Sequence, residues 1–567
     1  MNHPTTPRLQ IRRILPLTRQ INILLYAVAL GLAVGFISLA YRWSFKSCGT
    51  VFRGAFDSLP VNLIFLMPVA GSVLLILVVK VLRAEVREYV PEVIESSIRN
   101  TALRLKDGLV CFVTSALTLG SGGSAGPEGP MAFTGASVGS ALGRRLRLDN
   151  RHAKILLGAG AAAGIAAMFN APLAGVLFAL ELILFNDLTM SAVTPVILSS
   201  VAASAVSFHF LGDHPTFRVP LFAMNSYLEL FAYAVLGVAG GFVSALFCRT
   251  MHLAGRFFHH LRLGTATPVL GALVVGGLLV FIPRVGGYGH DAIDAILHGE
   301  GTLPFFTALV FFKILATALT LQSGNSGGIF APALLIGAAL GAGVGGGLQL
   351  TFPGAGSVEA YALIGMAAVM AGTIHTPLTA MMLIFELTRD YHTILPLMTV
   401  TVISTLVAYG MGSESLYIAP LSRKKLDFRM IRDLGSLGDV HAVNLMRHHF
   451  AAVRPGDSPA EIRRKLQRYP YKRALYLTTD DRLLGYLSLD TLHLLDTFSL
   501  DELSQSFRQV IHPQDTLYET LHKLRTAEGI LPVVDEGGRV RGIISNKIFI
   551  EKYLPLLKVS SAKRSGI

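Results

Sequence analysis

Residues 169–182 read FNAPLAGVLFALEL, and residues 374–387 read IHTPLTAMMLIFEL. The two stretches align without a gap, with proline at the fourth position and glutamate at the thirteenth position of both. These residues are Pro172, Glu181, Pro377 and Glu386. A glycine-rich loop ending in proline precedes each stretch, at 120–130 and at 323–332. Because loop, proline and glutamate recur in one order, the pattern predicts an internal structural repeat, which isolated small-residue packing motifs would not produce.

The composition places this repeat in a membrane. Of the 567 residues, 52% are hydrophobic and only 15% are charged, whereas soluble domains carry about 25% charged residues. Apolar blocks fill the chain from residue 21 to about residue 410, and some, such as 61–79 and 227–247, exceed the length of about 18 residues that marks a membrane span. A single soluble enzyme is therefore excluded, and a polytopic membrane protein with a soluble tail is predicted.

Glycine and proline interrupt several apolar segments and leave them too short to cross a hydrocarbon core of about 30 Å. Broken helices at membrane depth are tolerated where their backbone faces protein or a water-filled cavity. Two halves with interrupted helices at matching positions are typical of transporters built from inverted repeats. We therefore predict an all-α polytopic membrane domain over 21–420, with two inverted repeats at about 21–212 and 227–411.

The basic residues gather at the edges of the apolar blocks, within a formal net charge of +13. Four arginines and no acidic residue precede the first block: Arg8, Arg12, Arg13 and Arg19. By the positive-inside rule, residues 1–20 form a cytoplasmic N-terminus of a multi-pass protein of the cell membrane. The loop 46–60 then lies outside, Lys80 and Arg83 mark the return to the cytoplasm, and the C-terminus is cytoplasmic as well. No basic run is interleaved with aromatic residues, so nucleic acid is not an expected partner.

Patterns associated with enzymes are weak in this sequence. Cys48, Cys111 and Cys248 are scattered, so they predict neither disulfides nor a metal site. The G-x-S-x-G match at 122–126 lacks the strand that a serine hydrolase requires, and the G-x-G-x-x-G match at 341–346 lies in an apolar helix rather than in a βαβ unit. We expect no catalytic residue, no metal and no cofactor.

The two glycine-rich loops have the chemistry of an anion site. Residues 120–130 read GSGGSAGPEGP, residues 323–332 read SGNSGGIFAP, and each opens an apolar helix. The first turn of a helix has N–H groups without intrahelical partners and the positive end of the macrodipole, and both attract anions. Two such helix starts converging from the two halves would hold an anion without full positive charges, weakly enough for it to leave again.

Glu128 lies inside the first of these loops, within apolar sequence. Its carboxylate is itself an anion, so it can occupy the site when charged and withdraw when protonated. Intramembrane carboxylates are costly and are therefore functional candidates. The alternative is an acidic residue that only favours the positive end of its own helix. We predict a gate.

Four motifs in order resemble the CLC family of chloride channels and proton/chloride antiporters: GPEGP at 126–130, FNAPLAG at 169–175, GGIFAP at 327–332, and Tyr417 in SLYI. The resemblance covers the chain from the first apolar block to the polar tail. It implies a homodimer in the lipid bilayer, with one pathway per subunit for chloride or a similar small anion.

The resemblance also implies roles for single residues. Glu128 matches the external gating glutamate of the family. The backbone N–H groups of Ile329 and Phe330 match its central anion site, and Tyr417 matches the tyrosine whose hydroxyl contacts that ion. The neighbouring glycines of the two loops are implied to bind the anion as well: Gly126, Gly129, Gly327 and Gly328.

Three departures from the family pattern bear on mechanism. The family loop Gly-x-Gly-Ile-Pro appears as REYVP at 87–91, which puts Glu88 in the pathway where a serine often ligates the anion. Pro127 replaces the arginine of Gly-Arg-Glu-Gly-Pro. Leu182 stands where antiporters commonly have a second glutamate as the internal proton acceptor. Voltage- or pH-gated passive chloride conduction is therefore favoured, and proton/chloride exchange remains the alternative.

Other charged residues of the membrane region are weaker candidates. Lys313, within FFKIL, either raises the positive potential of the pathway or is paired. Glu181 and Glu386 are expected to cap or brace neighbouring helices, and His375 is expected to be a packing residue. Because the membrane region offers few acidic groups, a CBS-regulated divalent-cation channel, which needs clustered carboxylates or carbonyls, is the weaker alternative class.

After residue 420 the composition becomes polar. Residues 421–438 form a basic linker, and residues 439–567 contain two similar strand–turn–strand modules, each with a helix before it. The modules resemble a tandem pair of CBS domains, a small cytoplasmic α+β unit. Nucleotide-binding CBS domains often have an acid three residues after a serine, but here Asp490 follows Ser488 one residue too early and no acid follows Ser545. Adenine nucleotide is therefore a doubtful ligand, and a structural tail that braces a dimer is the alternative.

Overall fold

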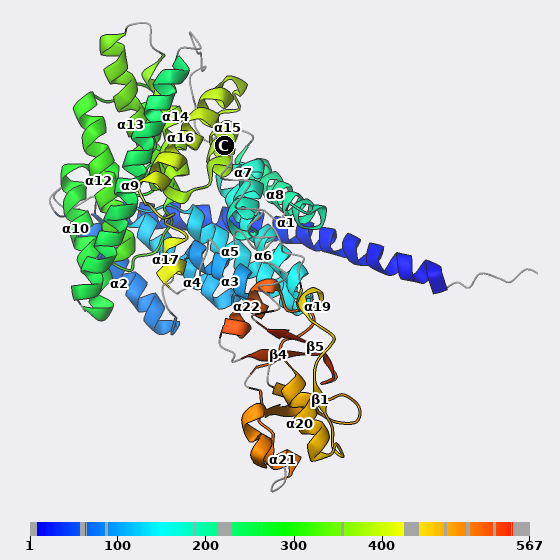
Figure 1. Ribbon diagram of the computed structural model, residues 1–567. Coiled ribbons are helices and arrows are strands. Elements are labelled where there is room, and N and C mark those ends of the chain that lie inside the picture. Colours follow the sequence, from blue (N-terminus) through cyan, green and yellow to red (C-terminus); the bar gives the residue numbers. More distant parts are fainter. Residues whose placement is uncertain are drawn as a thin grey trace, which may run out of the picture. The chain divides into compact units, whose positions relative to one another are not determined.

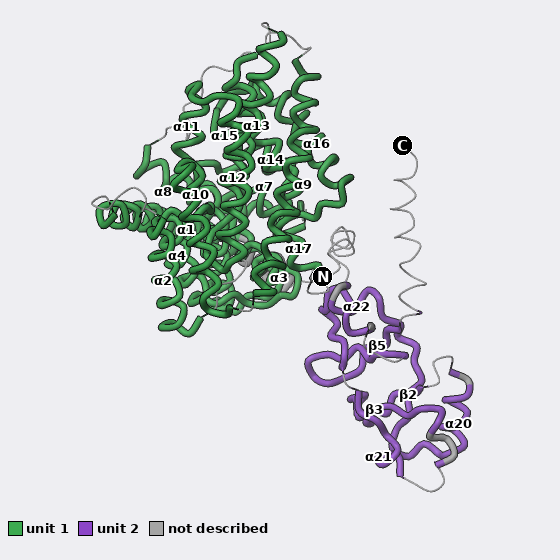
Figure 2. The backbone as a smooth tube through the Cα atoms, turned by 90° about the vertical axis from the view of Figure 1, so that its left-hand side faces the viewer, with its two compact units in different colours: residues 1–428 green, residues 429–567 purple. Residues whose placement is uncertain are grey.

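The structure of the chain is a computed structural model. It describes residues 8–56, 63, 65–84, 89–185, 188–212, 229–261, 263–352, 356–423, 441–469, 473–494, 499–507, 509–525, 529–545 and 547. The chain divides into two compact units, Met1–Phe428 and Arg429–Ile567 (Figure 2).

The first unit is built from two sets of helices that follow one another in the same order (Figure 1). The first set is α1 (Arg8–Phe56), α2 (Leu66–Val81), α3 (Tyr89–Arg99), α4 (Leu105–Gly120), α5 (Glu128–Arg145), α6 (Asn150–Phe169), α7 (Pro172–Phe178) with a π-helical turn (Ala179–Ile183), and α8 (Met190–Leu211). The second set is α9 (Glu229–Leu261), α10 (Thr267–Phe281), α11 (His290–Leu297), α12 (Leu303–Gln322), α13 (Phe330–Thr351), α14 (Val358–Ile374), α15 (Pro377–Thr388) and α16 (Ile394–Gly410), after which α17 (Ala419–Arg423) follows. Equivalent pairs pack in both sets, α1 on α8 like α9 on α16, and α5 on α6 like α13 on α14. The predicted all-α fold with an internal repeat is confirmed.

Eight helices among the described residues are long and apolar enough to cross a membrane, whereas α2, α14 and α15 are shorter. Large apolar side chains such as Val201, Phe231 and Leu406 are exposed on α8, α9 and α16, as expected of helices that face hydrocarbon. The predicted loop 46–60 is wrong in its first part, since α1 continues to Phe56. No proline stands between residues 44 and 56 to stop the helix. Residues 57–62 lie outside the described residues.

Helices α6 and α14, each the second helix after a glycine loop, begin and end with the same kinds of capping residue. The Asp149 carboxylate accepts a hydrogen bond from an N–H in the first turn of α6, and the Ser357 hydroxyl accepts one in the first turn of α14. Asn170 ends α6 with a φ of 55°, and His375 ends α14 with a φ of 57°. Both residues use the left-handed conformation that commonly terminates helices. His375 is thus a helix-terminating residue.

The two glutamates of the repeat cap helices across the repeat interface. Glu386 of α15 accepts hydrogen bonds from Leu173 N (2.9 Å) and Ala174 N (2.7 Å), at the start of α7. Glu181 of the π-helical turn accepts hydrogen bonds from Thr379 N (3.0 Å) and Thr379 Oγ1 (2.7 Å), at the start of α15. Each carboxylate therefore satisfies free N–H groups of the equivalent helix in the other half. The expectation that these residues cap neighbouring helices is confirmed.

Replacing Glu386 by glutamine should lower the free energy of unfolding by about 1 kcal/mol, because a neutral oxygen is a weaker acceptor than a carboxylate. The measurement is the denaturation midpoint of the detergent-solubilised protein, and Glu181→Gln should give a similar loss. Glu300→Gln is the matched control, since Glu300 forms an exposed ion pair with Arg284 at 3.0 Å that contributes little. Equal midpoints for Glu386→Gln and Glu300→Gln would contradict the capping role.

The second unit repeats one small α+β module. The first copy contains β1 (Ala452–Val453), α20 (Pro459–Arg468), β2 (Arg473–Leu477) and β3 (Leu483–Ser488), and the second contains α22 (Leu517–Arg525), β4 (Ile530–Val534) and β5 (Val540–Ser545). The antiparallel hairpins share one register, because Arg473 pairs with Ser488 as Ile530 pairs with Ser545. In both hairpins the register of the strands also shifts before the last residue pair. The predicted pair of CBS-like modules is confirmed.

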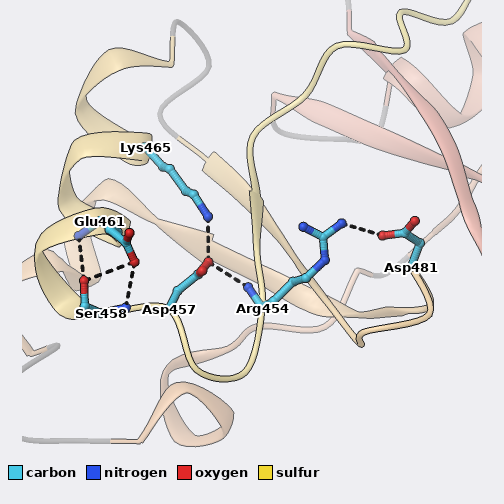
Figure 3. Close-up of polar contacts among 6 residues, drawn as sticks. All are labelled: Arg454, Asp457, Ser458, Glu461, Lys465 and Asp481. Atoms are coloured by element: carbon cyan, nitrogen blue, oxygen red, sulfur yellow. Dashed lines mark hydrogen bonds and ion pairs between the residues drawn. The ribbon is translucent and has the colours of Figure 1, made fainter.

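Polar contacts fix the start of α20 in the first module (Figure 3). The Ser458 hydroxyl and the Glu461 carboxylate form a reciprocal capping box. Asp457 accepts a 2.6 Å hydrogen bond from Lys465 Nζ, and Arg454 Nη2 lies 2.6 Å from Asp481 Oδ1. Burial alone would raise the pKa of the Asp457 carboxyl, but hydrogen bonds from Lys465 and from the Arg454 backbone N–H outweigh it and lower that pKa. The second module repeats the arrangement with other residues: Asp515, Thr516, Glu519 and Lys523.

Candidate functional site

The two glycine loops contact each other directly. Gly126 N donates to Gly328 O at 2.8 Å, and Gly328 N donates to Gly126 O at 2.6 Å. Gly126 stands two residues before α5, and Gly328 stands two residues before α13. This reciprocal pair of hydrogen bonds therefore brings the N-termini of α5 and α13, one from each half, to the same place.

Hydroxyl groups extend the contact between the loops. Ser124 N donates to Thr320 Oγ1 at 3.1 Å, and Ser326 N donates to Thr118 Oγ1 at 3.2 Å. Thr118 and Thr320 lie at equivalent places near the C-terminal ends of α4 and α12. Each loop is thus held by the helix that precedes the other loop, so the internal symmetry of the sequence becomes a physical symmetry about the Gly126–Gly328 contact.

Glu128 fills the space that two of these glycines leave open. It is the first residue of α5 and only 1% exposed. A methyl group placed on Gly126 would lie 2.1 Å from Glu128 Oε2 and 3.2 Å from Ala331 N, and one on Gly328 would lie 3.3 Å from the same oxygen. The carboxyl group therefore lies beside the first turn of α13. Its Oε2 has no hydrogen-bond partner among the described residues.

A cavity of about 240 Å³ lies next to this contact and is lined by Gly328 but not by Glu128. The main chain of the second loop, Gly327–Ile329, forms part of its wall together with Gly129 and Tyr417. The buried Tyr417 ring lies 5.8 Å from the Phe330 ring, and its hydroxyl lies near the Ile329 backbone. That hydroxyl has no hydrogen-bond partner among the described residues. The cavity is thus lined by a helix start and a buried, unpartnered hydroxyl.

Tyr89, which sequence reasoning missed, also lines this cavity. It begins α3, and its hydroxyl forms a hydrogen bond with Ser326 Oγ, which also accepts a 3.0 Å hydrogen bond from Thr114 Oγ1. Tyr89 therefore links α3 to the second glycine loop. Tyr89 is the third residue of the REYVP motif at 87–91, next to the position that the family resemblance gives to a serine. That residue, Glu88, lies outside the described residues.

Lys313 is fully buried but does not line the cavity. Its Nζ donates 2.9 Å hydrogen bonds to Val285 O and Gly287 O. Gly287 N in turn donates to Gly122 O of the first loop at 3.2 Å. Electrostatic attraction acts between Lys313 and Glu128. The structure thus shows Lys313 paired with two carbonyl groups, and a positive potential from it in the pathway stays a prediction.

The sequence-predicted residues divide by unit. Those of the two loops converge around the Gly126–Gly328 contact and the cavity: Gly126, Glu128, Gly129, Gly327, Gly328, Ile329, Phe330 and Tyr417. The remaining three lie in the second unit, where Ser488 Oγ donates to Asp490 Oδ2 at 3.2 Å and Ser545 is buried at the end of β5. Among the described residues, no group of three or more His, Cys, Asp or Glu side chains could hold a metal ion.

Comparison with known proteins agrees with this division. A family model described as "Voltage gated chloride channel" matches residues 71–409, and one described as "CBS domain" matches residues 438–493 and 508–554. A protein named "Putative chloride channel protein ClcB-like" from Ralstonia nicotianae is 36% identical over 331 residues, which cover 57% of this chain and 77% of that protein. One named "H(+)/Cl(-) exchange transporter ClcA" from Citrobacter koseri is 31% identical over 436 residues, which cover 73% of this chain and 91% of that protein.

Solved structures share the fold. A slow cyanobacterial Cl⁻/H⁺ antiporter aligns with a TM-score of 0.64 at 24% identity, over 71% of this chain and 97% of that chain. A eukaryotic CLC transporter aligns with a TM-score of 0.64 at 19% identity, over 94% of this chain and 98% of that chain.

Proposed function

Because the chain belongs to the voltage-gated chloride channel (CLC) family, we propose that chloride or a similar small anion crosses the membrane between its two glycine loops. The observation that carries the proposal is the reciprocal Gly126–Gly328 contact, which joins two helix N-termini beside a cavity. Relatives of the chain bear the names of channels and of exchangers. Anion transport is the property that both names share.

The anion would bind to N–H groups at the start of α13. The N–H groups of Ile329 and Phe330 lie at the positive end of this helix, where intrahelical partners are missing. The Tyr417 hydroxyl would add one neutral donor. The N–H group of each of Gly126 and Gly328 donates to the carbonyl oxygen of the other, so these glycines would shape the site rather than ligate the ion. An anion held only by dipoles binds weakly enough to leave again.

Glu128 would be the gate. Its carboxyl group lies beside Ala331 N, and in the ionised form it would keep a permeant anion away from the start of α13. A positive charge on Lys313 would favour the ionised form there. Protonation would remove that attraction and release the side chain. Anion flux should therefore rise as the pH falls.

We favour passive conduction over proton exchange. Leu182, at the position that the family resemblance gives to an internal proton acceptor, is a buried apolar residue of the π-helical turn. The test is a liposome carrying the purified protein and a chloride gradient. Chloride flux without uphill proton movement supports a channel, and uphill proton movement identifies an antiporter. The proposal would be overturned in favour of a divalent-cation channel if there were no anion flux and the reversal potential of the current followed a magnesium gradient.

We propose further that both termini are cytoplasmic and that the protein is a homodimer. The segment 144–151, from the end of α5 to the start of α6, carries Arg144, Arg145, Arg147 and Arg151, whereas the equivalent segment 351–358 from the end of α13 to the start of α14 carries no basic residue. By the positive-inside rule the first segment is cytoplasmic and the second is not, which fits halves of opposite orientation. Labelling of single cysteines in the two segments tests the orientation, and cross-linking in the membrane tests the dimer.

Replacing Tyr417 by phenylalanine should weaken anion binding in the cavity by about threefold to tenfold, because one hydrogen-bond donor is lost. Bromide binding by calorimetry, together with anomalous bromide diffraction, measures the effect. Tyr361→Phe is the control, because Tyr361 is also fully buried but does not line the cavity. Unaltered bromide occupancy in Tyr417→Phe would remove this residue from the site.

A further inference from the structure

The internal repeat predicts a counterpart of the anion cavity beside the first glycine loop. The cavity beside the second loop is lined by Tyr89 at the start of α3 and by Met251 and His252 of α9. In the other half, α11 is the equivalent of α3, and α1 is the equivalent of α9. Residues at the start of α11 and on α1 are therefore expected to surround the approach to Glu128.

Tyr288, just before α11, lies in this place. Its neighbour Gly287 donates a 3.2 Å hydrogen bond from its N–H group to Gly122 O of the first loop. The Tyr288 ring lies 5.6 Å from the Phe45 ring of α1. Electrostatic interaction acts between Tyr288 and Glu128. Tyr288 therefore contacts α1 and lies near both the first loop and Glu128.

Helix α1 packs beside the first loop in the register that α9 has beside the second. A methyl group placed on Gly49 of α1 would lie 3.7 Å from the carbonyl oxygen of the last residue of α4. One placed on Gly255 of α9 would lie 2.6 Å from the side-chain oxygen of the last residue of α12. Lys46 precedes Gly49 by three residues, as His252 precedes Gly255. Lys46 is thus the counterpart, beside the first loop, of a residue that lines the anion cavity.

Three cations share one face of α1 at this level. Arg42, Lys46 and Arg53 are spaced by four and seven residues, close to one and two turns of a helix with about 3.6 residues per turn. Arg42 is half-buried, and the other two are exposed. Electrostatic interaction acts between Tyr288 and both arginines, and between Lys46 and His290. The basic face of α1 therefore lies toward the start of α11.

Acidic residues of α11 oppose this basic face in part. Asp291 and Asp294 act electrostatically on His290, and Asp294 also lies 3.9 Å from His298. The three cations of α1 outnumber these two carboxylates. In the proposed orientation this end of α1 lies outside the cell, where the positive-inside rule makes cations uncommon. Their presence there therefore needs a functional reason.

We propose that Arg42, Lys46 and Arg53 form an anion-recruiting surface on the Glu128 side of the pathway, which concentrates chloride or a similar small anion in front of the gate. This inference rests on the proposed function and adds an entry site to it. Cations around an entrance raise the local concentration of anions and speed their association, and dissolved salt screens this effect. Arg42 also donates hydrogen bonds to carbonyl groups in the last turn of α6. Lys46 and Arg53 are therefore the residues to change.

The test measures chloride flux into liposomes at constant pH in the Glu128→Gln background, where the gate neither titrates nor limits entry. The double variant Lys46→Gln with Arg53→Gln should lower flux about threefold to tenfold at an ionic strength of about 0.01 M, where charges act over about 30 Å. In about 1 M sodium gluconate, an impermeant salt, the double variant should equal the background protein, because charges then act over only about 3 Å.

Two further variants are controls. Lys46→Arg with Arg53→Lys keeps both charges and should keep the flux of the background protein. Arg256→Gln removes an exposed cation of α9, the equivalent helix of the other half, and should also keep that flux. Size-exclusion profiles of each variant establish that folded protein is compared.

The possible results separate the inference from the proposed function. Equal flux of the double variant and the background protein at low ionic strength would overturn the inference and leave the proposed function standing. A loss of flux that persists at high ionic strength would assign Lys46 and Arg53 a structural role and would also overturn the inference. If the background protein conducts no anion at either ionic strength, the proposed function itself fails.

Discussion

Glutamine at position 128 should raise anion flux at neutral pH by about tenfold or more and remove the pH dependence of that flux. The amide has nearly the shape of the carboxyl group but can never carry its charge. Its attraction to the start of α13 and to Lys313 is therefore lost at every pH. If the open state is a minor state populated at roughly 10% or less, abolishing the closed state increases flux by this factor.

The measurement is chloride efflux from liposomes between about pH 4.5 and 9.5, which brackets the range in which a buried glutamate can titrate. Glu181→Gln is the matched control. Glu181 is also a carboxylate of the membrane unit, but it caps α15 through Thr379. This variant should be less stable yet retain the pH dependence of the unmodified protein. A pH profile for Glu128→Gln equal to that of the unmodified protein would show that the gate lies elsewhere.

The repeat could be predicted because equivalent residues of its two copies have the same structural roles. Pro172 and Pro377 begin α7 and α15, and Glu181 and Glu386 cap the opposite copies. Each role restricts the residue type at its position, so the two copies of the sequence can be aligned. The α+β tail was predictable for a similar reason, since alternating strands and tight turns recur in both modules.

Helices α3, α4 and α11 could not be found in this way. Helices α3 and α11 are short and amphipathic. Helix α3 packs on α5, and α11 packs on α13. The first turn of α4 contains Lys106 and Asp107, which interrupt its hydropathy. A search for apolar segments detects helices that face lipid, and these helices lie largely inside the unit.

The site was predictable in its components but not in its assembly. The sequence indicates that each glycine loop opens a helix, and the family resemblance adds Tyr417. The sequence does not indicate that Gly126 and Gly328 form hydrogen bonds with each other, because that contact depends on how the two halves of the chain pack together. Tyr89 was missed for the same reason, since its partner Ser326 belongs to the other half.

Alanine at position 126 should open the pathway without disrupting the fold. Gly126 does not have a positive φ, so its backbone accepts a side chain. The added methyl group would lie 2.1 Å from Glu128 Oε2, far inside van der Waals contact, and 3.2 Å from Ala331 N. The backbone contact is tight but tolerable. The carboxyl oxygen is the far end of a flexible side chain, so the collision is relieved when Glu128 leaves its place. Flux at neutral pH should approach that of Glu128→Gln.

A glycine of a helix interface gives the opposite result and serves as the control. A methyl group on Gly341 would lie 2.0 Å from Tyr361 O, a backbone atom of α14 that cannot rotate away. Gly341→Ala should therefore reduce the yield of folded protein, seen by size-exclusion chromatography, whereas Gly126→Ala should elute normally and conduct chloride with little dependence on pH. Suppose that Gly126→Ala folds but has the low flux and the pH profile of the unmodified protein. Glu128 would then keep its place despite the methyl group. The carboxyl group would therefore not be what occupies the space between the two glycines.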